Sequence, residues 1–242
     1  MADLSNQPIR SRTQAGIGDA SIDQGLRAFL LGTYNYMVLG LAITGLAAYG
    51  LYSMPQLMVA IYTNPIGWPI LLFAPLAMVF FLSFRINSLS PATAQLLFFA
   101  YSALVGLSLA GIFAIYAHTS IVRVFLITAA SFGALSLYGY TTKRDLTALG
   151  SFCMMGLFGL ILAMVVNFFL GSSALDFAIS IVGVLVFAGL TAWDTQNLKS
   201  MYYATAGDGT AAARASIMGA LRLYLDFLNM FLFLLRLLGN RE

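Results

Sequence analysis

Two aspartates, Asp194 and Asp226, stand at the same end of the last two hydrophobic segments of a chain with few acids. Only 9 of its 242 residues are aspartate or glutamate. A carboxylate at the centre of a membrane helix costs about 2.5–3.5 kcal/mol on insertion scales, so such residues usually face a bundle interior or line a path for ions or protons. Because both carboxylates stand near one depth in adjacent segments, we expect them to be neighbours with a shared role.

The last hydrophobic segment also carries a polar stripe. At 100° per residue the members of this stripe lie within about 80° of one another on one helix face. They are Arg222, Asp226, Asn229, Phe233 and Arg236. Lipid cannot accommodate such a face, so we expect the last helix to be central, wrapped by the others. The alternative is a purely structural ion pair between Asp226 and Arg222 one turn earlier, although Arg222 lies near the interface and could reach water without a partner.

The composition indicates a membrane protein. Hydrophobic residues make up 60% of the chain and charged residues 9%, against roughly 25% charged in soluble domains. The net charge of +3 is explained by basic residues between the hydrophobic segments, so it does not indicate nucleic-acid binding. The single cysteine, Cys153, cannot form an intramolecular disulfide, and the single histidine, His118, does not suggest a transition-metal site; we assign no metal site and no cofactor.

Seven segments are long and apolar enough to cross a membrane, at about 20 residues per crossing. We expect an all-α membrane protein with helices near residues 29–51, 66–84, 93–116, 122–141, 147–170, 175–195 and 218–238. In the third segment, small residues recur every four positions, at Ser102, Gly106, Ala110 and Ala114. Such a face favours close helix packing over a pore lining. We treat the Gly- and Ala-rich residues 204–216 as a loop.

The N-terminal residues 1–24 are polar and carry both charge signs, so we expect a short disordered cytoplasmic tail before a transmembrane domain at 25–242. Basic residues concentrate in the loops on the side of this tail, and the positive-inside rule then places the N-terminus in the cytoplasm and the C-terminus outside. No targeting signal is visible, and the short tail favours a bacterial inner membrane over an organelle.

Three stretches resemble the Bax inhibitor-1 family (the transmembrane Bax-inhibitor-motif proteins, YccA-like in bacteria). They are AWDTQNLK at the end of the sixth segment, LRLYLDFLNMFLFLLRLLG in the seventh and YNYMVLGLAITGLAAYG in the first. The resemblance covers nearly the full chain. It implies two groups of three helices around a central C-terminal helix. It also implies a pH-sensitive calcium leak; eukaryotic members suppress cell death, and some bacterial members modulate a membrane-bound AAA protease.

The same resemblance assigns roles to individual residues. The paired aspartates of the family map onto Asp194 and Asp226, and a basic partner at the inner end of the second segment maps onto Arg85. With Arg222 as a further possible partner, the charged pair would latch the inner mouth closed through an arginine, and protonation would release it. The second segment contains no acid, so an extra cation-binding carboxylate found there in relatives is missing.

Two functions of different class follow. The first is a pH-sensitive leak for calcium or other cations, gated by the aspartate pair. The second is a non-conducting membrane regulator of a membrane protease or of a stress or cell-death pathway. An intramembrane hydrolase is not expected, because the chain has no HExxH, no GxSxG and no serine–histidine pair. We therefore expect no enzymatic activity.

Overall fold

A computed structural model describes residues 8–205 and 207–241, with side chains from residue 24 onward. Its elements in chain order are α1 (Pro8–Tyr52), α2 (Pro55–Tyr62), α3 (Gly67–Arg85), the 3-10 turn η1 (Ile86–Ser88), α4 (Pro91–Leu109), α5 (Ile112–Ile115), α6 (His118–Thr141), α7 (Thr147–Leu170), α8 (Ser173–Ala204) and α9 (Gly209–Leu238). Seven of the helices are long and apolar enough to span a membrane, which confirms the all-α transmembrane class and the seven expected segments.

The largest departure from the expected boundaries is at the turn between the last two helices. The prediction of a loop over 204–216 is wrong, because α8 continues to Ala204 and α9 already begins at Gly209. The Asp208 side chain caps α9 by accepting hydrogen bonds from the backbone N–H groups of Thr210 (2.9 Å) and Ala211 (3.0 Å). The alanines that follow are strong helix formers, so α9 begins before the apolar residues that predict the membrane span.

The beginning of the chain also differs from expectation in its secondary structure. Helix α1 begins at Pro8, within the residues expected to form a disordered tail, and its candidate membrane span lies within residues 24–52. Residues 1–7 lie outside the described residues, and the disorder expected for the N-terminal tail stays a prediction. The short helix α2, which no hydropathy segment indicates, follows α1 directly and begins at a proline.

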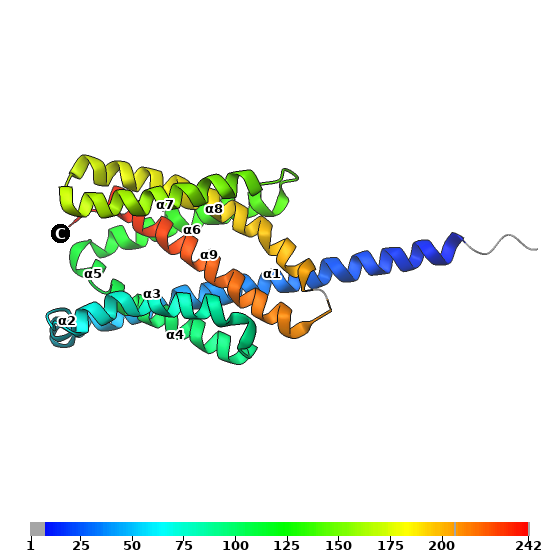
Figure 1. The fold of residues 1–242 in the computed structure, drawn as a ribbon, viewed down its shortest axis with the longest axis horizontal. Coiled ribbons are helices and arrows are strands. Elements are labelled where there is room, and N and C mark those ends of the chain that lie inside the picture. The colour runs from blue at the N-terminus through cyan, green and yellow to red at the C-terminus, as the bar shows by residue number, and fades with distance from the viewer. Residues whose placement is uncertain (1–7, 206, 242) are drawn as a thin grey trace, which may run out of the picture.

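The helices form two groups with α9 running obliquely between them (Figure 1). One group contains α1, α3 and α4, in which α4 packs on both α1 and α3; the other contains α6, α7 and α8, in which α8 packs on both α6 and α7. Helix α9 packs against α1, α4, α6 and α8, and 56% of its most apolar stretch is buried, the largest share among the seven spans. The expected central position of the last helix is therefore confirmed.

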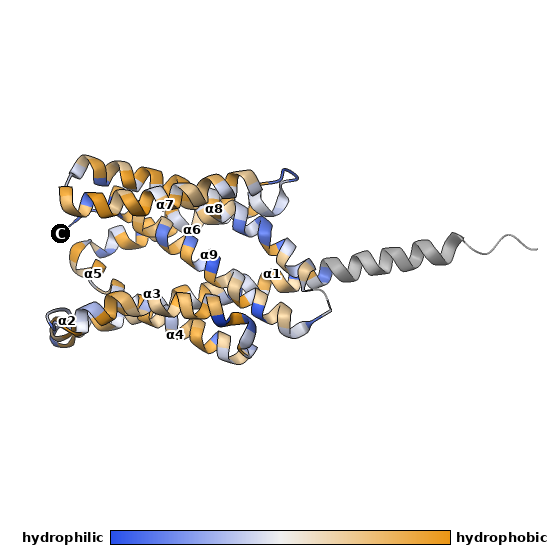
Figure 2. Ribbon diagram, viewed as in Figure 1, coloured by the Kyte–Doolittle hydropathy of each residue, from blue (hydrophilic) through white to orange (hydrophobic). Residues whose placement is uncertain are grey.

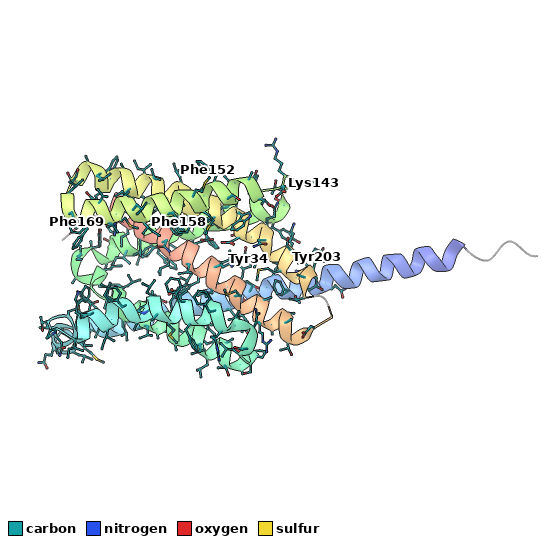
Figure 3. All side chains as sticks on the ribbon, viewed as in Figure 1. Tyr34, Lys143, Phe152, Phe158, Phe169 and Tyr203 are labelled. Atoms are coloured by element: carbon teal, nitrogen blue, oxygen red, sulfur yellow. The ribbon has the colours of Figure 1, made fainter. Side chains whose placement is uncertain are left out.

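The outer helices present apolar side chains at the surface (Figure 2). Helix α7 is the least buried span, because only 11% of its most apolar stretch is buried inside the protein. Phe152, Phe158 and Phe169 on this helix (Figure 3) are 67%, 65% and 80% exposed. Exposed phenylalanines over a whole helix are suited to lipid rather than water. The hydrophilic positions gather at the loops nearest the N-terminus and along α9, which is consistent with a bundle that crosses a bilayer.

The first group is joined to α9 by a buried polar cluster at the crossing of α1 and α4. The Thr44 hydroxyl contacts the backbone carbonyl of Ser102 (2.9 Å) and the hydroxyl of Tyr224 on α9 (2.6 Å). Ser102 and Tyr224 are fully buried, and a Cβ atom added at Gly106 would collide with the backbone carbonyl of Thr44. Ser102 and Gly106 thus act in helix packing as the small-residue face predicts, whereas Ala114 is exposed beyond the end of α4.

This close approach predicts that Gly106→Ala destabilises the protein by about 1–3 kcal/mol, because the new methyl group must separate two backbones. Thermal unfolding in detergent measures the effect. Gly133→Ala on α6 is the matched control: its Cβ would meet open space, so its melting temperature should stay the same or rise slightly with the better helix propensity of alanine. Equal melting temperatures for the two variants would contradict the packing interpretation.

Candidate functional site

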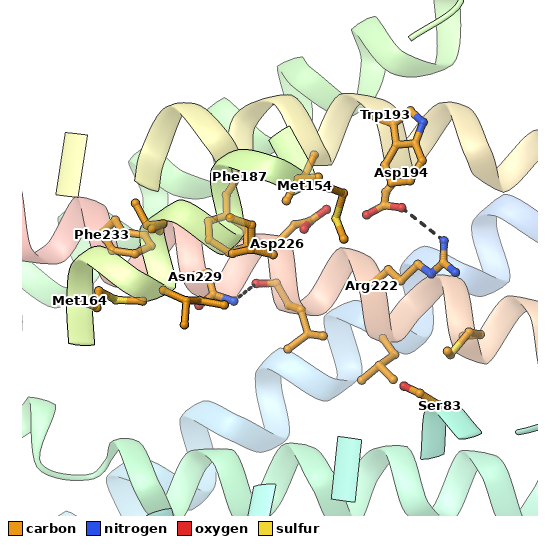
Figure 4. A pocket seen from close by; sticks show the side chains of 17 residues that line it. Ser83, Met154, Met164, Phe187, Trp193, Asp194, Arg222, Asp226, Asn229 and Phe233 are labelled. Atoms are coloured by element: carbon orange, nitrogen blue, oxygen red, sulfur yellow. Dashed lines mark hydrogen bonds and ion pairs between the residues drawn. The ribbon is translucent and has the colours of Figure 1, made fainter. Parts of the chain in front are cut away.

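Asp194 and Asp226 line a single cavity of about 640 Å³ between the two helix groups. Asp194 comes from α8 and Asp226 from α9, and both are buried, at 8% and 4% exposure. Figure 4 shows their carboxylates on the same side of the cavity, with Asn229 one turn further along α9. The other walls are formed mainly by α7, together with Ser83 of α3. The two aspartates are therefore neighbours, as their positions in the sequence suggest, while their role stays a prediction.

Arg222 joins α9 to α8. Its guanidinium lies 3.6 Å from Oδ1 of Asp194, with its own side chain 41% exposed and that of Asp194 10% exposed. The ion pair of Arg222 in the described structure is thus with Asp194 on the neighbouring helix, and not with Asp226 one turn along its own helix. The purely structural Arg222–Asp226 pair considered from the sequence is not the arrangement found here, although Arg222 does line the same cavity.

The carboxylates have unused hydrogen-bonding capacity. Asp194 Oδ1 and Asp226 Oδ2 are both buried without a hydrogen-bond partner among the described residues. Arg222 approaches Asp194 Oδ1 at ion-pair distance but not at hydrogen-bond distance. Most buried polar atoms in proteins have a partner, so an unpartnered carboxylate oxygen beside a cavity marks a place for a proton, water or a cation.

The remaining residues of the predicted site are spread along the bundle. Asn229 lines the cavity and donates from Nδ2 to the backbone carbonyl of Leu225 (2.8 Å). Arg236 lies near the far end of α9, exposed, and pairs with Asp176 at 3.6 Å. Arg85 is exposed at the last residue of α3 and is not among the residues that line the cavity, so the structure does not bring it to the aspartates. Its role as a partner of the pair stays a prediction.

The residues that follow Asp194 hold α8 in place. The hydroxyl of buried Thr195 is 3.2 Å from the hydroxyl of Tyr34 on α1. Gln196 clamps the connection between α6 and α7: its Oε1 accepts from the backbone N–H of Leu146 and its Nε2 donates to the backbone carbonyl of Arg144, both at 2.8 Å. These contacts fix the rotation of α8 and so keep Asp194 turned toward α9. Sequence reasoning did not single out Tyr34 or Gln196, although Gln196 belongs to the recognised AWDTQNLK stretch.

A second cavity lies beside the first, toward the turn between α8 and α9. It has a volume of about 260 Å³ and is bounded by η1, α8 and the start of α9. Met218 lines both cavities, so its side chain belongs to the walls of both. Arg214 also lines the second cavity, and its Nε donates to the backbone carbonyl of Leu89 (2.7 Å). This contact ties the start of α9 to the connection between α3 and α4.

Comparison with known proteins gives one consistent family. The family described as inhibitor of apoptosis-promoting Bax1 matches residues 26–242. An uncharacterized protein of Rickettsia prowazekii is 49% identical over 222 residues, 92% of this chain and 93% of the relative. The inner membrane protein YbhL of Escherichia coli K12 is 46% identical over 219 residues, 90% of this chain and 94% of the relative. An uncharacterized membrane protein of Streptococcus pyogenes serotype M1 is 36% identical over 91% of this chain and 96% of its own length.

The geometry predicts that Asp194 and Arg222 are energetically coupled. Arg222→Gln leaves Asp194 without its cation and should destabilise the protein by about 1–2 kcal/mol, a value reduced for the partial exposure of the guanidinium. Adding Asp194→Asn removes the stranded charge and should restore most of the loss, as a double-mutant cycle of melting temperatures can measure. Arg236→Gln, which breaks an exposed pair, should have little effect. Strictly additive effects of Arg222→Gln and Asp194→Asn would contradict the coupling.

Proposed function

The chain belongs to the Bax inhibitor-1 family of membrane proteins, and on that premise we propose that it is a pH-sensitive leak pathway for calcium or other cations. Asp194 and Asp226 are its sensor and gate. The observation that carries the proposal is the pair of buried aspartates on α8 and α9, which line one cavity and each have a buried carboxylate oxygen without a partner among the described residues. A purely structural role would favour full hydrogen bonding of these atoms, because each unpartnered buried polar atom destabilises the fold.

The proposed gate works through the charge balance of the cavity. Its described lining contains three charged side chains, Asp194, Asp226 and Arg222, and the residues contributed by α3 and α7 are uncharged. With both acids ionised, Arg222 attracts the α8 carboxylate and holds α8 against α9. Proton uptake by the pair weakens that attraction, so α8 and α9 separate more readily as the pH falls. Lower pH therefore increases conduction.

The same lining suits a passing cation better than a resident one. Calcium in proteins takes about six to eight oxygen ligands. Two carboxylates and the amide oxygen of Asn229 supply part of that shell, and water must supply the rest. A partly hydrated ion held by few protein ligands leaves readily, which is what a leak requires.

The proposed orientation follows from the distribution of basic residues. Lys199 lies near the end of α8 and Arg214 near the start of α9, and the α6–α7 connection with Lys143 and Arg144 contacts the same end of α8. The positive-inside rule places this end, and the N-terminus, in the cytoplasm. Together with the relative named as an inner membrane protein, this supports location in a bacterial inner membrane. The second cavity, behind Met218, is then on the cytoplasmic side of the aspartates.

The first functional prediction concerns pH. Calcium flux into proteoliposomes should be severalfold larger at about pH 6 than at about pH 8, on either side of neutrality. Asp194→Asn should weaken closure at alkaline pH and flatten this dependence, and Asp226→Asn should flatten it too, because each removes a titrating carboxyl from the cavity. Asp176→Asn, an aspartate of α8 outside the cavity, is the matched control and should keep the wild-type ratio.

Two outcomes of the flux experiment would overturn the proposal. If the wild-type ratio persists in both Asp194→Asn and Asp226→Asn, the pair is not the sensor. If wild-type protein gives no flux above protein-free vesicles at either pH, the alternative of a non-conducting regulator is favoured, including a partner of a membrane-bound AAA protease.

The second functional prediction concerns Met218. Because Met218 lines both the central cavity and the second cavity, we expect its side chain to form the barrier between them. Met218→Ala should then join the two cavities and increase flux at alkaline pH severalfold. Met201→Ala is the control, because Met201 lines the second cavity but not the central one. Flux through Met218→Ala that equals flux through Met201→Ala would place the barrier elsewhere.

A further inference from the structure

The central cavity combines an apolar wall with a concentrated negative charge. Met154, Leu157, Ile161 and Met164 of α7 form one side of it, and Phe187 and Phe233 contribute aromatic rings. Its volume of about 640 Å³ falls within the range of about 300–1,000 Å³ that holds small organic molecules. Methionine side chains adapt to irregular apolar shapes, and the faces of phenylalanine rings attract cations.

One wall of the cavity belongs to α7, the least buried of the seven spans, whose outer surface is suited to lipid. Its α7 wall includes Met154 and Ile161, which are 38% and 44% exposed. On the opposite side, α3 contributes the small side chain of Ser83. Helix α3 packs on α4 and α7 packs on α8, so these two helices belong to different groups, and both contribute to the cavity wall. A route from the bilayer to the cavity would therefore pass between α3 and α7.

The charge at the end of this route selects the kind of molecule. Asp226 is 4% exposed and its Oδ2 has no hydrogen-bond partner among the described residues. Two carboxylates and one guanidinium line the cavity, which leaves one net negative charge when both acids are ionised. Lipid phosphate would be repelled by that charge, whereas a single positive centre would neutralise it. The apolar walls favour a cation whose charge is carried by an apolar body.

We propose that the cavity is a binding site for monovalent organic cations with an apolar body, such as lipophilic ammonium or phosphonium ions, which enter from the bilayer between α3 and α7. The positive centre sits against Asp226, and the apolar groups pack on the side chains of α7 and on Phe187. The inference deepens the proposed function by naming a ligand class for the same site, but it does not require any ion to cross the membrane.

Tetraphenylphosphonium and tetraphenylborate make the test, because they share one shape and carry opposite charges. Binding of radiolabelled tetraphenylphosphonium to the full chain in lipid nanodiscs at about pH 8, where free carboxyls are ionised, is measured against empty nanodiscs. We expect saturable binding that unlabelled tetraphenylphosphonium displaces and tetraphenylborate does not. Asp226→Asn should weaken binding at least tenfold, while Asp176→Asn should leave it unchanged.

A second pair of variants tests the binding site without changing the charge of Asp226. Ile161→Trp fills the cavity from its α7 wall and should abolish binding. Leu162→Trp is the matched control: the neighbouring Leu162 is 66% exposed and is not among the lining residues, so binding should persist. No saturable binding by wild-type protein, or wild-type affinity in both Asp226→Asn and Ile161→Trp, would overturn the inference. Binding without calcium flux would contradict the proposed leak function but support the binding site. Calcium flux without binding would contradict the binding site but support the leak function.

Discussion

The structure depends on one constraint: a carboxylate on the last helix cannot face hydrocarbon. Asp226 lies well inside α9, and an ionised side chain at that depth is costly unless protein or water surrounds it. Placing α9 between the two groups meets this constraint, and it explains why the span with the most polar face is also the most buried. The helices with the most apolar surfaces, such as α7, are left at the periphery where lipid can cover them.

A central polar helix then has to be joined to its neighbours by polar contacts, and these are unequal on its two sides. Toward the first group, Tyr224 of α9 is bonded to Thr44 in a fully buried cluster. Toward the second group, Arg222 and Asp194 meet at a looser 3.6 Å beside a cavity. The side with satisfied hydrogen bonds is suited to be a fixed support. The side with unpartnered carboxylate oxygens is suited to change with protonation or ligand binding, because breaking its contacts costs less free energy.

Much of this arrangement could be predicted from the sequence, because lipid makes hydropathy and intramembrane charge strong signals. The seven spans, the central last helix and the proximity of Asp194 and Asp226 all follow from them. The extensions of α8 and α9 beyond the expected spans could not be predicted from hydropathy, because hydropathy falls where a helix leaves the bilayer although the helix continues. The sequence signal for the early start of α9 was Asp208 followed by alanines. The partner of Arg222 depends on helix rotation, which in turn depends on contacts such as that of Gln196 with the α6–α7 connection. A sequence spacing of four favours Asp226, and only packing across helices shows that Asp194 is the partner.

The position of α9 at the end of the chain has a consequence for biogenesis. Chains are synthesised from the N-terminus, so the six surrounding helices leave the ribosome before the helix that joins their two groups. Until α9 is inserted, the polar ends of Thr44 and Asp194 have no partner on it, and the two halves must wait in the membrane as separate subassemblies. Assembly of the bundle is therefore completed only when α9 docks between the two preformed groups, and a ribosome that stops before residues 209–238 releases the two groups without the helix that joins them.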